Sequence, residues 1–156
     1  MEVMGHITPT GKNAISMSMY LKGKNFLAAA MLLRKNNGYE YVVLHLLCQG
    51  IEITLKALLL RANYDKYKTK LRKYGRSGHD LVPLVADALE EFNLKPLKPN
   101  LESELSSLAA LYSSHSLRYV SLYDVFVDPK SIKSDLVLRR TAALVRLSER
   151  AISNAE

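Results

Sequence analysis

Apolar residues recur at the three- and four-residue spacing of an α-helix along most of this chain. The clearest stripe follows Asp80, a residue suited to cap a helix, and Pro83 falls in the first turn, where proline is tolerated. Its members are Leu81, Leu84, Val85, Ala88, Leu89 and Phe92. This pattern predicts an amphipathic helix over residues 81–92.

Four further helices are expected from similar patterns. The first begins near Ala14 with Asn13 as its N-cap and ends at residues 36–38, and the second runs from Tyr39 to about Ala62, roughly 35 Å. A two-proline connector, residues 94–100, ends in a capping Asn100 and leads into a helix from Leu101 to about Tyr112. The last helix runs from Pro129, capped by Asp128, to about Ser153.

Their spacing also predicts which side chains are buried. The expected core positions outside residues 39–92 are Ile15, Met19, Phe26, Ala30, Leu33, Leu101, Leu105, Leu108, Tyr112, Ile132, Leu136, Ala143, Leu147 and Ala151. Residues 117–127 are rich in Val, Tyr and Phe and are expected to be extended or irregular. The 156 residues therefore predict one domain, residues 1–156, with an all-α fold, an antiparallel helical bundle of about five helices.

Composition narrows the class of protein. The apolar fraction of 48% is that of a globular chain, and the single cysteine, Cys48, excludes an internal disulfide and a multi-cysteine metal site. The N-terminal residues lack the apolar core of a secretory signal, and the most apolar run, Tyr41 to Ile51, is too short to span a bilayer. His6 and His45 lack partners at metal-ligand spacing. We therefore expect a cytoplasmic protein with no metal, no cofactor and no membrane contact.

Positive charge is concentrated in one segment. The chain carries a net charge of +7, and residues 61–76 hold seven bases against Asp65 alone, with Tyr64, Tyr67 and Tyr74 interleaved. Clustered Lys and Arg attract phosphate, and exposed tyrosine rings stack on unpaired bases. The segment is either a nucleic-acid contact that uses Lys70, Arg72, Lys73 and Arg76, or a solvated mobile loop that only keeps the protein soluble.

A polar row interrupts the otherwise apolar second helix. His45, Gln49, Glu52 and Lys56 are spaced by four, three and four residues and share one narrow face, and Glu52 can pair with Lys56 at i, i+4. We call these four residues the polar seam. It is either the solvated strip of the helix or a seam that a ligand or partner subunit reaches. Gly50 weakens the helix beside it, which close approach of another backbone would explain.

The string Cys48-Gln-Gly-Ile-Glu-Ile-Thr-Leu-Lys-Ala-Leu-Leu-Leu60, followed by a basic segment and then Gly78-His-Asp-Leu81, resembles the HEPN family over the middle third of the chain. The resemblance implies a small helical bundle, frequent homodimers, association with RNA or nucleotides, and a setting in toxin–antitoxin or defence systems, often with a nucleotidyltransferase-like partner. Many members are metal-independent ribonucleases in which four to six residues separate a late Arg from a His.

This chain departs from that ribonuclease motif. At the late position Arg118 is followed by Tyr119 and Tyr123, with a tyrosine where His is expected, and His115 precedes the arginine. Arg72 and His79 have the bare spacing but lie in the basic segment. His79 is either a catalytic partner of Arg72 or a residue that braces the loop through a hydrogen bond.

We therefore expect a catalytically degenerate or accessory RNA- or nucleotide-binding protein. Its expected phosphate contacts are Lys56, Lys70, Arg72, Lys73, Arg76 and Arg118, with Tyr119 as a stacking surface. One alternative is an endoribonuclease that uses Arg72 or Arg118 with His79. Another is a structural partner module that dimerises through the polar seam.

Overall fold

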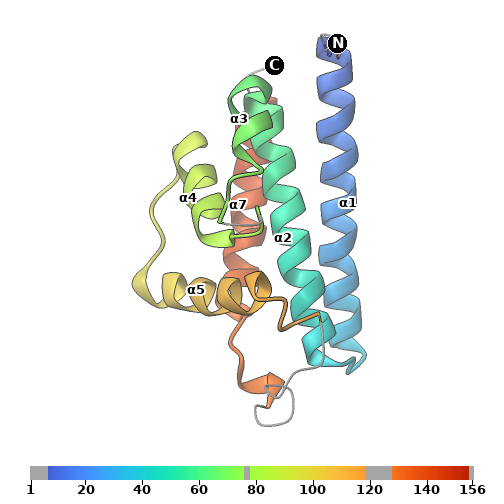
Figure 1. Ribbon diagram of the computed structural model, residues 1–156, viewed down its shortest axis with the longest axis vertical. Coiled ribbons are helices and arrows are strands. Elements are labelled where there is room, and N and C mark those ends of the chain that lie inside the picture. Colours follow the sequence, from blue (N-terminus) through green and yellow to red (C-terminus); the bar gives the residue numbers. More distant parts are fainter. Residues whose placement is uncertain (1–6, 76–77, 119–127, 155–156) are drawn as a thin grey trace.

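The computed structural model describes residues 7–75, 78–118 and 128–154, and within these ranges it is all-helical. Six α-helices and one short 3₁₀ turn follow one another in this part of the chain (Figure 1). They are α1 (Pro9–Lys35), α2 (Glu40–Ala62), α3 (Tyr64–Lys70), α4 (Leu81–Glu91), α5 (Pro99–Ser113), η1 (Pro129–Ser131) and α7 (Asp135–Ser153). The predicted all-α class is confirmed. The prediction of five helices missed α3, which forms inside the basic segment.

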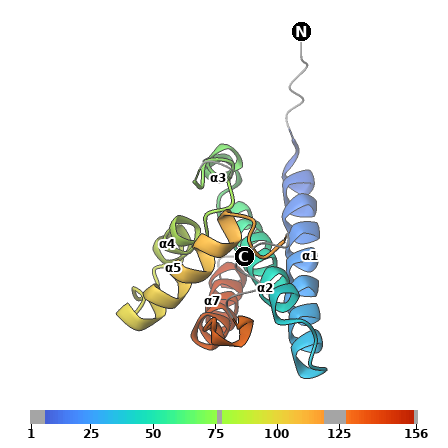
Figure 2. The ribbon, with the colours of Figure 1, turned by 60° about the horizontal axis from the view of Figure 1, so that its bottom comes forward.

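α2 is the central element. α1 lies antiparallel along one side of it, α7 packs behind it, and α4 and α5 cover a further side, with α5 running across the other helices (Figures 1 and 2). Its apolar side chains form the middle of the core; Leu44, Ile51, Leu55 and Leu59 are fully buried. A helix that is apolar on most sides gains most by being enclosed, which is why α2 occupies the centre.

Two close approaches between backbones join α1 to α2. A Cβ added to Gly23 of α1 would lie 2.6 Å from the backbone nitrogen of Thr54, and a Cβ added to Gly50 of α2 would lie 2.9 Å from the backbone nitrogen of Leu27. The expectation that Gly50 marks a close backbone contact is therefore confirmed. The two glycines are needed because any side chain would hold the helices apart.

By length and composition alone α2 is apolar enough to cross a membrane, with a mean hydropathy of 1.6 in its most apolar window. The sequence predicted that the apolar stretch ends at Ile51, but in α2 it continues past Glu52. Other elements cover 67% of that window, and the core helices of globular proteins pass the same test.

Some predicted boundaries are wrong. α1 begins at Pro9, five residues earlier than expected, because Thr8 rather than Asn13 caps it: the Thr8 hydroxyl accepts a hydrogen bond from the Gly11 N–H at 3.1 Å. α5 likewise begins at Pro99, so Asn100 lies inside its first turn. Proline at the first helical position sets both starts.

The last predicted helix is interrupted. Asp128 does cap a turn, accepting a hydrogen bond from the Lys130 N–H at 3.0 Å, but that turn is the three-residue η1, and α7 starts only at Asp135. The irregular segment expected at residues 117–127 lies almost wholly outside the described residues.

The buried faces of the first and last helices agree with the prediction only in part: Ala30 is buried, and Met19, Leu33 and Ile132 pack against the core. Ile15, Leu136 and Leu147 are exposed, at 38–39%, and Ala151 is exposed as well. The side chains actually buried are Ser16, Gly23 and Ala30 in α1, and Val137, Thr141, Leu144, Val145 and Ser148 in α7. Both helices carry apolar residues on more than one side, so contact with neighbouring helices, and not spacing alone, selects the buried side.

Candidate functional site

The polar seam is buried at its centre. Glu52 is only 5% exposed, and its Oε1 accepts a hydrogen bond from Lys56 Nζ at 2.6 Å. The predicted i, i+4 pair is thus confirmed. The side chain of Lys56 is 13% exposed, so this stretch of α2 is not a solvated strip.

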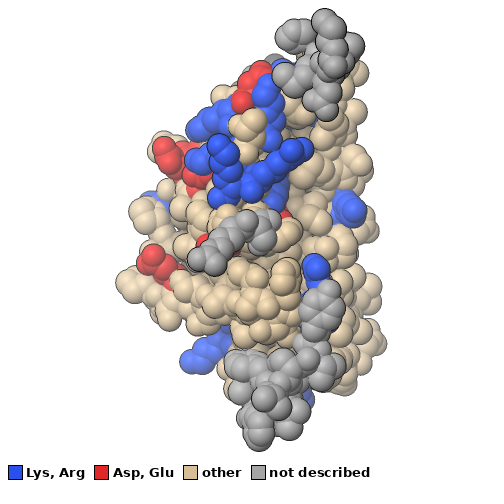
Figure 3. All heavy atoms as spheres, in the orientation of Figure 1, with Lys and Arg blue, Asp and Glu red and all other residues tan. Residues whose placement is uncertain are grey.

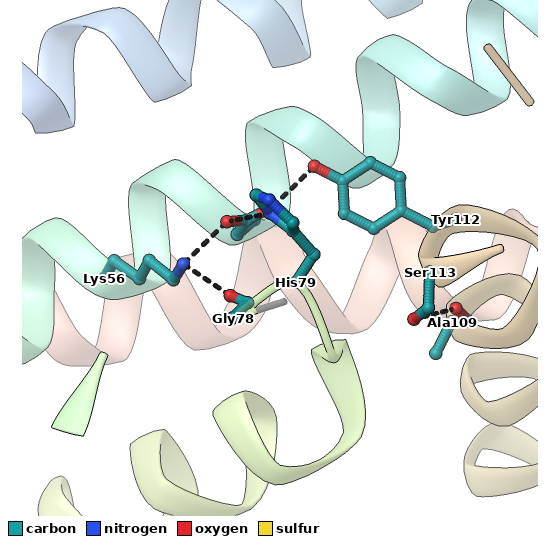
Figure 4. A network of polar contacts seen from close by, with 7 residues as sticks. Lys56, Gly78, His79, Ala109, Tyr112 and Ser113 are labelled. Carbon is teal, nitrogen blue, oxygen red and sulfur yellow. Dashed lines mark hydrogen bonds and ion pairs between the residues drawn. The ribbon is translucent and has the colours of Figure 1, made fainter. Parts of the chain in front are cut away.

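Two other elements close over Glu52. The hydroxyl of Tyr112, at the end of α5, donates to Glu52 Oε2 at 2.5 Å, and His79 Nδ1 lies 3.0 and 3.1 Å from the two carboxylate oxygens. Figure 4 shows Lys56, His79 and Tyr112 reaching one point from α2, from the loop before α4, and from α5. His79 and Tyr112, which follow Glu52 by 27 and 60 residues, therefore both contact its carboxylate.

This environment keeps Glu52 ionised. Burial by itself would raise its pKa, but hydrogen bonds from Lys56 and Tyr112, with the Lys56 charge and His79, outweigh burial and lower the pKa below the ordinary value. A carboxylate can only accept hydrogen bonds, so the bond to His79 requires the hydrogen on Nδ1 of His79.

The backbone on either side holds His79 in this position. Gly78 has a φ of +78°, a conformation that favours glycine, and its carbonyl accepts a second hydrogen bond from Lys56 Nζ at 2.7 Å. On the other side, Asp80 caps α4 by accepting from the Val82 N–H at 3.0 Å. The His79 side chain is nevertheless 43% exposed. When the ring is neutral with its hydrogen on Nδ1, Nε2 is a hydrogen-bond acceptor.

His45 also lies beside Tyr112. Its ring centroid is 5.9 Å from that of Tyr112, and the ring of His79 lies 6.2 Å away from the same tyrosine. Burial, then the charges of Arg118 and His115, lower the pKa of His45, and its Nδ1 is buried without a hydrogen-bond partner among the described residues. His45 is therefore a neutral, partly buried imidazole at neutral pH.

Lysine and arginine side chains gather over α3 and the segment after it (Figure 3). Several of them are already paired: Lys66 with Glu91 at 2.6 Å and Lys70 with Asp87 at 2.7 Å. Lys68 pairs with Asp65 at 3.0 Å. The charge of +6 counted along residues 61–76 is thus reduced in space by two acids of α4.

Two of the three interleaved tyrosines are buried, and the third, Tyr64, is half-buried with Lys12 Nζ 5.3 Å from its ring centroid. Tyr67 and Tyr74 are 1% and 4% exposed, and their hydroxyls donate to Glu91 and Asp87. These tyrosines anchor α3 and the following turn onto α4, which corrects the expectation of exposed rings. The segment is accordingly a folded element over residues 64–70 and not a mobile loop.

Arg72 and Lys73 are the exposed bases of this segment that form no ion pair within the described residues. The loop folds back after them, so a Cβ added to Gly78 would lie 3.2 Å from the carbonyl oxygen of Arg72. The backbone of Arg72 is therefore brought next to the residue that precedes His79. Lys70 remains 46% exposed beside its partner.

The other predicted site residues have different surroundings. Lys56, expected to bind phosphate, has its ammonium group between Glu52 and the Gly78 carbonyl, both internal partners. Arg118 is exposed, while Arg76 and Tyr119 lie outside the described residues. Gln49 is half-buried, and its side chain makes no hydrogen bond with the residues the structure describes. Cys48 is fully buried, and burial, then the charge of Glu52, raises the pKa of its thiol to about 12, so it is a packing residue.

The polar role of Tyr112 and the acids Asp87 and Glu91 were not predicted from the sequence. Tyr112 had no signal beyond its apolar spacing. The two acids did have one, because Asp87 and Glu91 are spaced by four residues, as are Lys66 and Lys70. Matching four-residue spacings of opposite charge on two helices indicate that the helices pair side by side.

Over residues 7–75, 78–118 and 128–154, no three His, Cys, Asp or Glu side chains are grouped so that they could hold a metal ion. The site that the structure assembles is therefore one of protein groups: a buried carboxylate, an oriented and accessible imidazole, and a basic surface beside it. No family model matches this chain, and no curated protein or solved structure matches it either.

Proposed function

We propose that this protein binds RNA or a nucleotide through the surface formed by Lys70, Arg72 and Lys73, as a HEPN-like protein that is catalytically degenerate or accessory. The observation that carries the proposal is the pair of exposed bases, Arg72 and Lys73, that no acid neutralises in the described structure, in a turn packed against Gly78. Unpaired bases on a rigid turn bind phosphate without first breaking an internal ion pair.

Three features support this surface over a purely solubilising role. The turn is folded, because buried Tyr67 and Tyr74 fix it to α4. Its lysines and arginines project together from one face of the molecule (Figure 3). His79 also lies beside it and presents a polar ring edge that can hydrogen-bond a ribose or base.

The test is fluorescence-anisotropy binding of single-stranded RNA to the wild type and to a variant with Lys70→Gln, Arg72→Gln and Lys73→Gln. We expect at least about a tenfold loss of affinity and a shallower salt dependence in this variant, because fewer counterions are released from the RNA. A matched control replaces the exposed Lys22, Lys98 and Lys133 by Gln. Equal losses in both variants, or unchanged binding in the first, would contradict the proposal.

The geometry of His79 favours one alternative, a metal-independent endoribonuclease. Glu52 holds His79 Nδ1 in place while the ring stays 43% exposed, the arrangement in which an orienting carboxylate leaves the second ring nitrogen to take a proton. Nε2 would remove the proton from a ribose 2′-OH, and the 2′ oxygen would attack phosphorus to form a 2′,3′-cyclic phosphate. The expelled 5′ oxygen would take a proton from water, and Arg72 would stabilise the charge on the phosphate.

Cleavage of single-stranded RNA in EDTA, lost in His79→Ala but with RNA binding retained, would establish that alternative. Binding without cleavage supports the accessory protein instead. If RNA is neither bound nor cut, the remaining candidate is the structural partner module.

The HEPN resemblance adds a biological setting to the proposal: a cytoplasmic toxin–antitoxin or defence system with a nucleotidyltransferase-like partner. Co-purification of the tagged chain with the product of a neighbouring reading frame tests this setting. If the neighbouring protein does not bind the chain, the proposed setting is wrong, while the proposed RNA binding is unaffected.

A further inference from the structure

A groove runs between α1 and α7, which both pack on α2 and lie antiparallel to each other. Near one end Lys24 of α1 pairs with Glu149 of α7 at 3.5 Å, and at the other end Arg34 lies 3.7 Å from Asp135. The two helices come close to each other at few other positions, because α2 lies between them (Figure 2). We call this surface the α1–α7 groove.

Two mainly apolar hollows lie in the α1–α7 groove. One, of about 270 Å³, is lined by Met17 of α1 and Ile152 of α7, and the other, of about 210 Å³, by Met31 and Leu138. Apolar side chains of α2 line both hollows from below. Met17 and Met31 are 14 residues apart, and so are Leu138 and Ile152. The hollows are therefore roughly 21 Å apart along the groove.

This spacing fits a helix. Residues 14 positions apart in an α-helix are separated by almost four full turns, so they project from the same face. A helix lying along the groove could place one apolar side chain in each hollow and complete a bundle with α1, α2 and α7. Met17 and Met31 are 47% and 56% exposed, and methionine, which is flexible and polarisable, is typical of surfaces that bind apolar helices.

Charge around the groove favours an acidic helix. α1 contains no acidic residue, and its exposed Lys35 lines one hollow. The acids beside the groove, Glu149 and Asp135, already have the basic partners Lys24 and Arg34. α7 carries three exposed arginines that form no ion pair with the residues the structure describes: Arg139, Arg146 and Arg150. Their spacing of seven and four residues places them on one face of α7.

We propose that the α1–α7 groove binds an acidic amphipathic helix of a partner protein, with one large apolar side chain in each hollow and carboxylates facing the bases of α1 and α7. Neither a flat lipid surface nor a phosphate backbone would fill two apolar hollows. The groove shares no residue with the surface formed by Lys70, Arg72 and Lys73, so this proposal does not rest on the proposed function.

The probe is a fluorescent synthetic peptide of three heptads, about 21 residues, with leucine at positions a and d and glutamate at e and g; its like charges oppose self-association. Anisotropy titrations should show saturable binding to the full chain. The same peptide with lysine in place of glutamate should bind at least about tenfold more weakly, because the arginines of α7 repel it. The acidic peptide with glutamine in place of leucine should also bind at least about tenfold more weakly, because it leaves the hollows empty.

Variants of the protein locate the binding. Met31→Glu should weaken binding of the acidic peptide at least about tenfold, because it places a carboxylate in a hollow that faces an acidic partner. Leu32→Glu is the matched control, since Leu32 is 63% exposed on the same helix and lines neither hollow. It should change the affinity by less than about twofold, because solvent and salt screen an exposed charge outside the hollow. Both variants should keep the helical circular dichroism of the wild type.

The arginines are tested separately. The variant with Arg139→Gln, Arg146→Gln and Arg150→Gln should bind the acidic peptide at least about fivefold more weakly. The variant with Lys70→Gln, Arg72→Gln and Lys73→Gln should bind it as the wild type does. A peptide affinity that falls only in the second variant would overturn the proposal.

Four further results would overturn it. They are no binding of the acidic peptide, equal binding of the acidic and basic peptides, binding that survives the loss of the leucines, and equal losses in Met31→Glu and Leu32→Glu. Binding to phosphatidylglycerol vesicles that Met31→Glu abolishes would also overturn it, because the hollows would then face lipid. These measurements contain no RNA, so a failure of the groove is distinguishable from a failure of the proposed RNA-binding surface.

Discussion

Glu52 is the residue that joins α2, the loop before α4, and α5. Its two oxygens accept from Lys56, His79 and Tyr112 although the residue is only 5% exposed. Burying a carboxylate costs several kcal/mol unless charge and hydrogen bonds compensate it. The three donors supply that compensation, so the removal of either charged partner should be costly.

Glu52→Gln should therefore lower the free energy of unfolding by roughly 2–4 kcal/mol, because the ammonium of Lys56 remains buried without a counter-charge. Urea denaturation at pH 7, followed by circular dichroism, measures this. The double variant Glu52→Gln, Lys56→Gln should recover part of the loss. If Glu52→Gln cost no more than the same change at the exposed Glu102, the network would not stabilise the fold.

His45 should make stability depend on pH near neutrality. Burial, with Arg118 and His115, holds its folded pKa below 6.5, so the unfolded chain takes up the proton first as the pH falls. This contribution to stability is complete above pH 6.5 and is lost as the pH falls towards the folded pKa. Urea midpoints at pH 7.5, 6.5 and 5.5 should fall in the wild type and fall less in His45→Gln.

His115→Asn is the control for that experiment. His115 is exposed and has a φ of +60°, which asparagine tolerates. This variant should keep most of the pH dependence of the wild type, because burial contributes more than His115 to lowering the pKa of His45; the same flattening in both variants would show that His45 is not its source.

At the residue scale, the sequence predicted the pair of Glu52 with Lys56 but not the long-range hydrogen bonds of Glu52. Glu52 and Lys56 were predictable because a helix fixes the distance between i and i+4. The bonds from His79 and Tyr112 depend on how the basic segment and α5 pack on α2, which no local spacing encodes. Tyr67 and Tyr74 were misassigned for the same reason, since their acceptors lie on another helix.

Among the elements, the α1–α2 pair depends on close approach. Gly23→Ala would place a Cβ 2.3 Å from Thr54 Oγ1 and 2.6 Å from its backbone nitrogen. We expect a net loss of about 1–3 kcal/mol in the free energy of unfolding, although alanine is favoured over glycine in a helix by about 1 kcal/mol. Thermal and urea denaturation of Gly23→Ala measures the loss. A stabilised variant would mean that the helices can separate without cost.

The elements also show when the periodicity of apolar residues predicts the buried face of a helix. α4 was predicted well because it has one apolar face and a clear cap at Asp80. α1 and α7 have apolar residues on more than one face, so spacing alone did not decide which of them are buried: Ala30 is buried as predicted, whereas Ile15, Leu136 and Leu147 are exposed.

At the scale of the whole molecule, the basic surface is tied to two other helices. Lys12 Nζ pairs with Asp65 at 2.9 Å, which ties the N-terminal part of α1 to α3. Tyr67 and Tyr74 tie α3 and the turn after it to α4. The bases that we propose for RNA binding, Lys70, Arg72 and Lys73, therefore stand on a folded part of the chain.

Three bases predict a modest salt dependence of RNA binding. Each phosphate that a base neutralises on single-stranded RNA contributes about −0.7 to the slope of log K against log salt concentration, so three contacts predict a slope of about −2. Anisotropy titrations at several salt concentrations should give this slope for the wild type and a shallower slope, by at least about one unit, for the variant with Lys70→Gln, Arg72→Gln and Lys73→Gln. The variant with Lys22→Gln, Lys98→Gln and Lys133→Gln should keep the slope of the wild type; the same slope in all three proteins would show that these three bases do not contact phosphate.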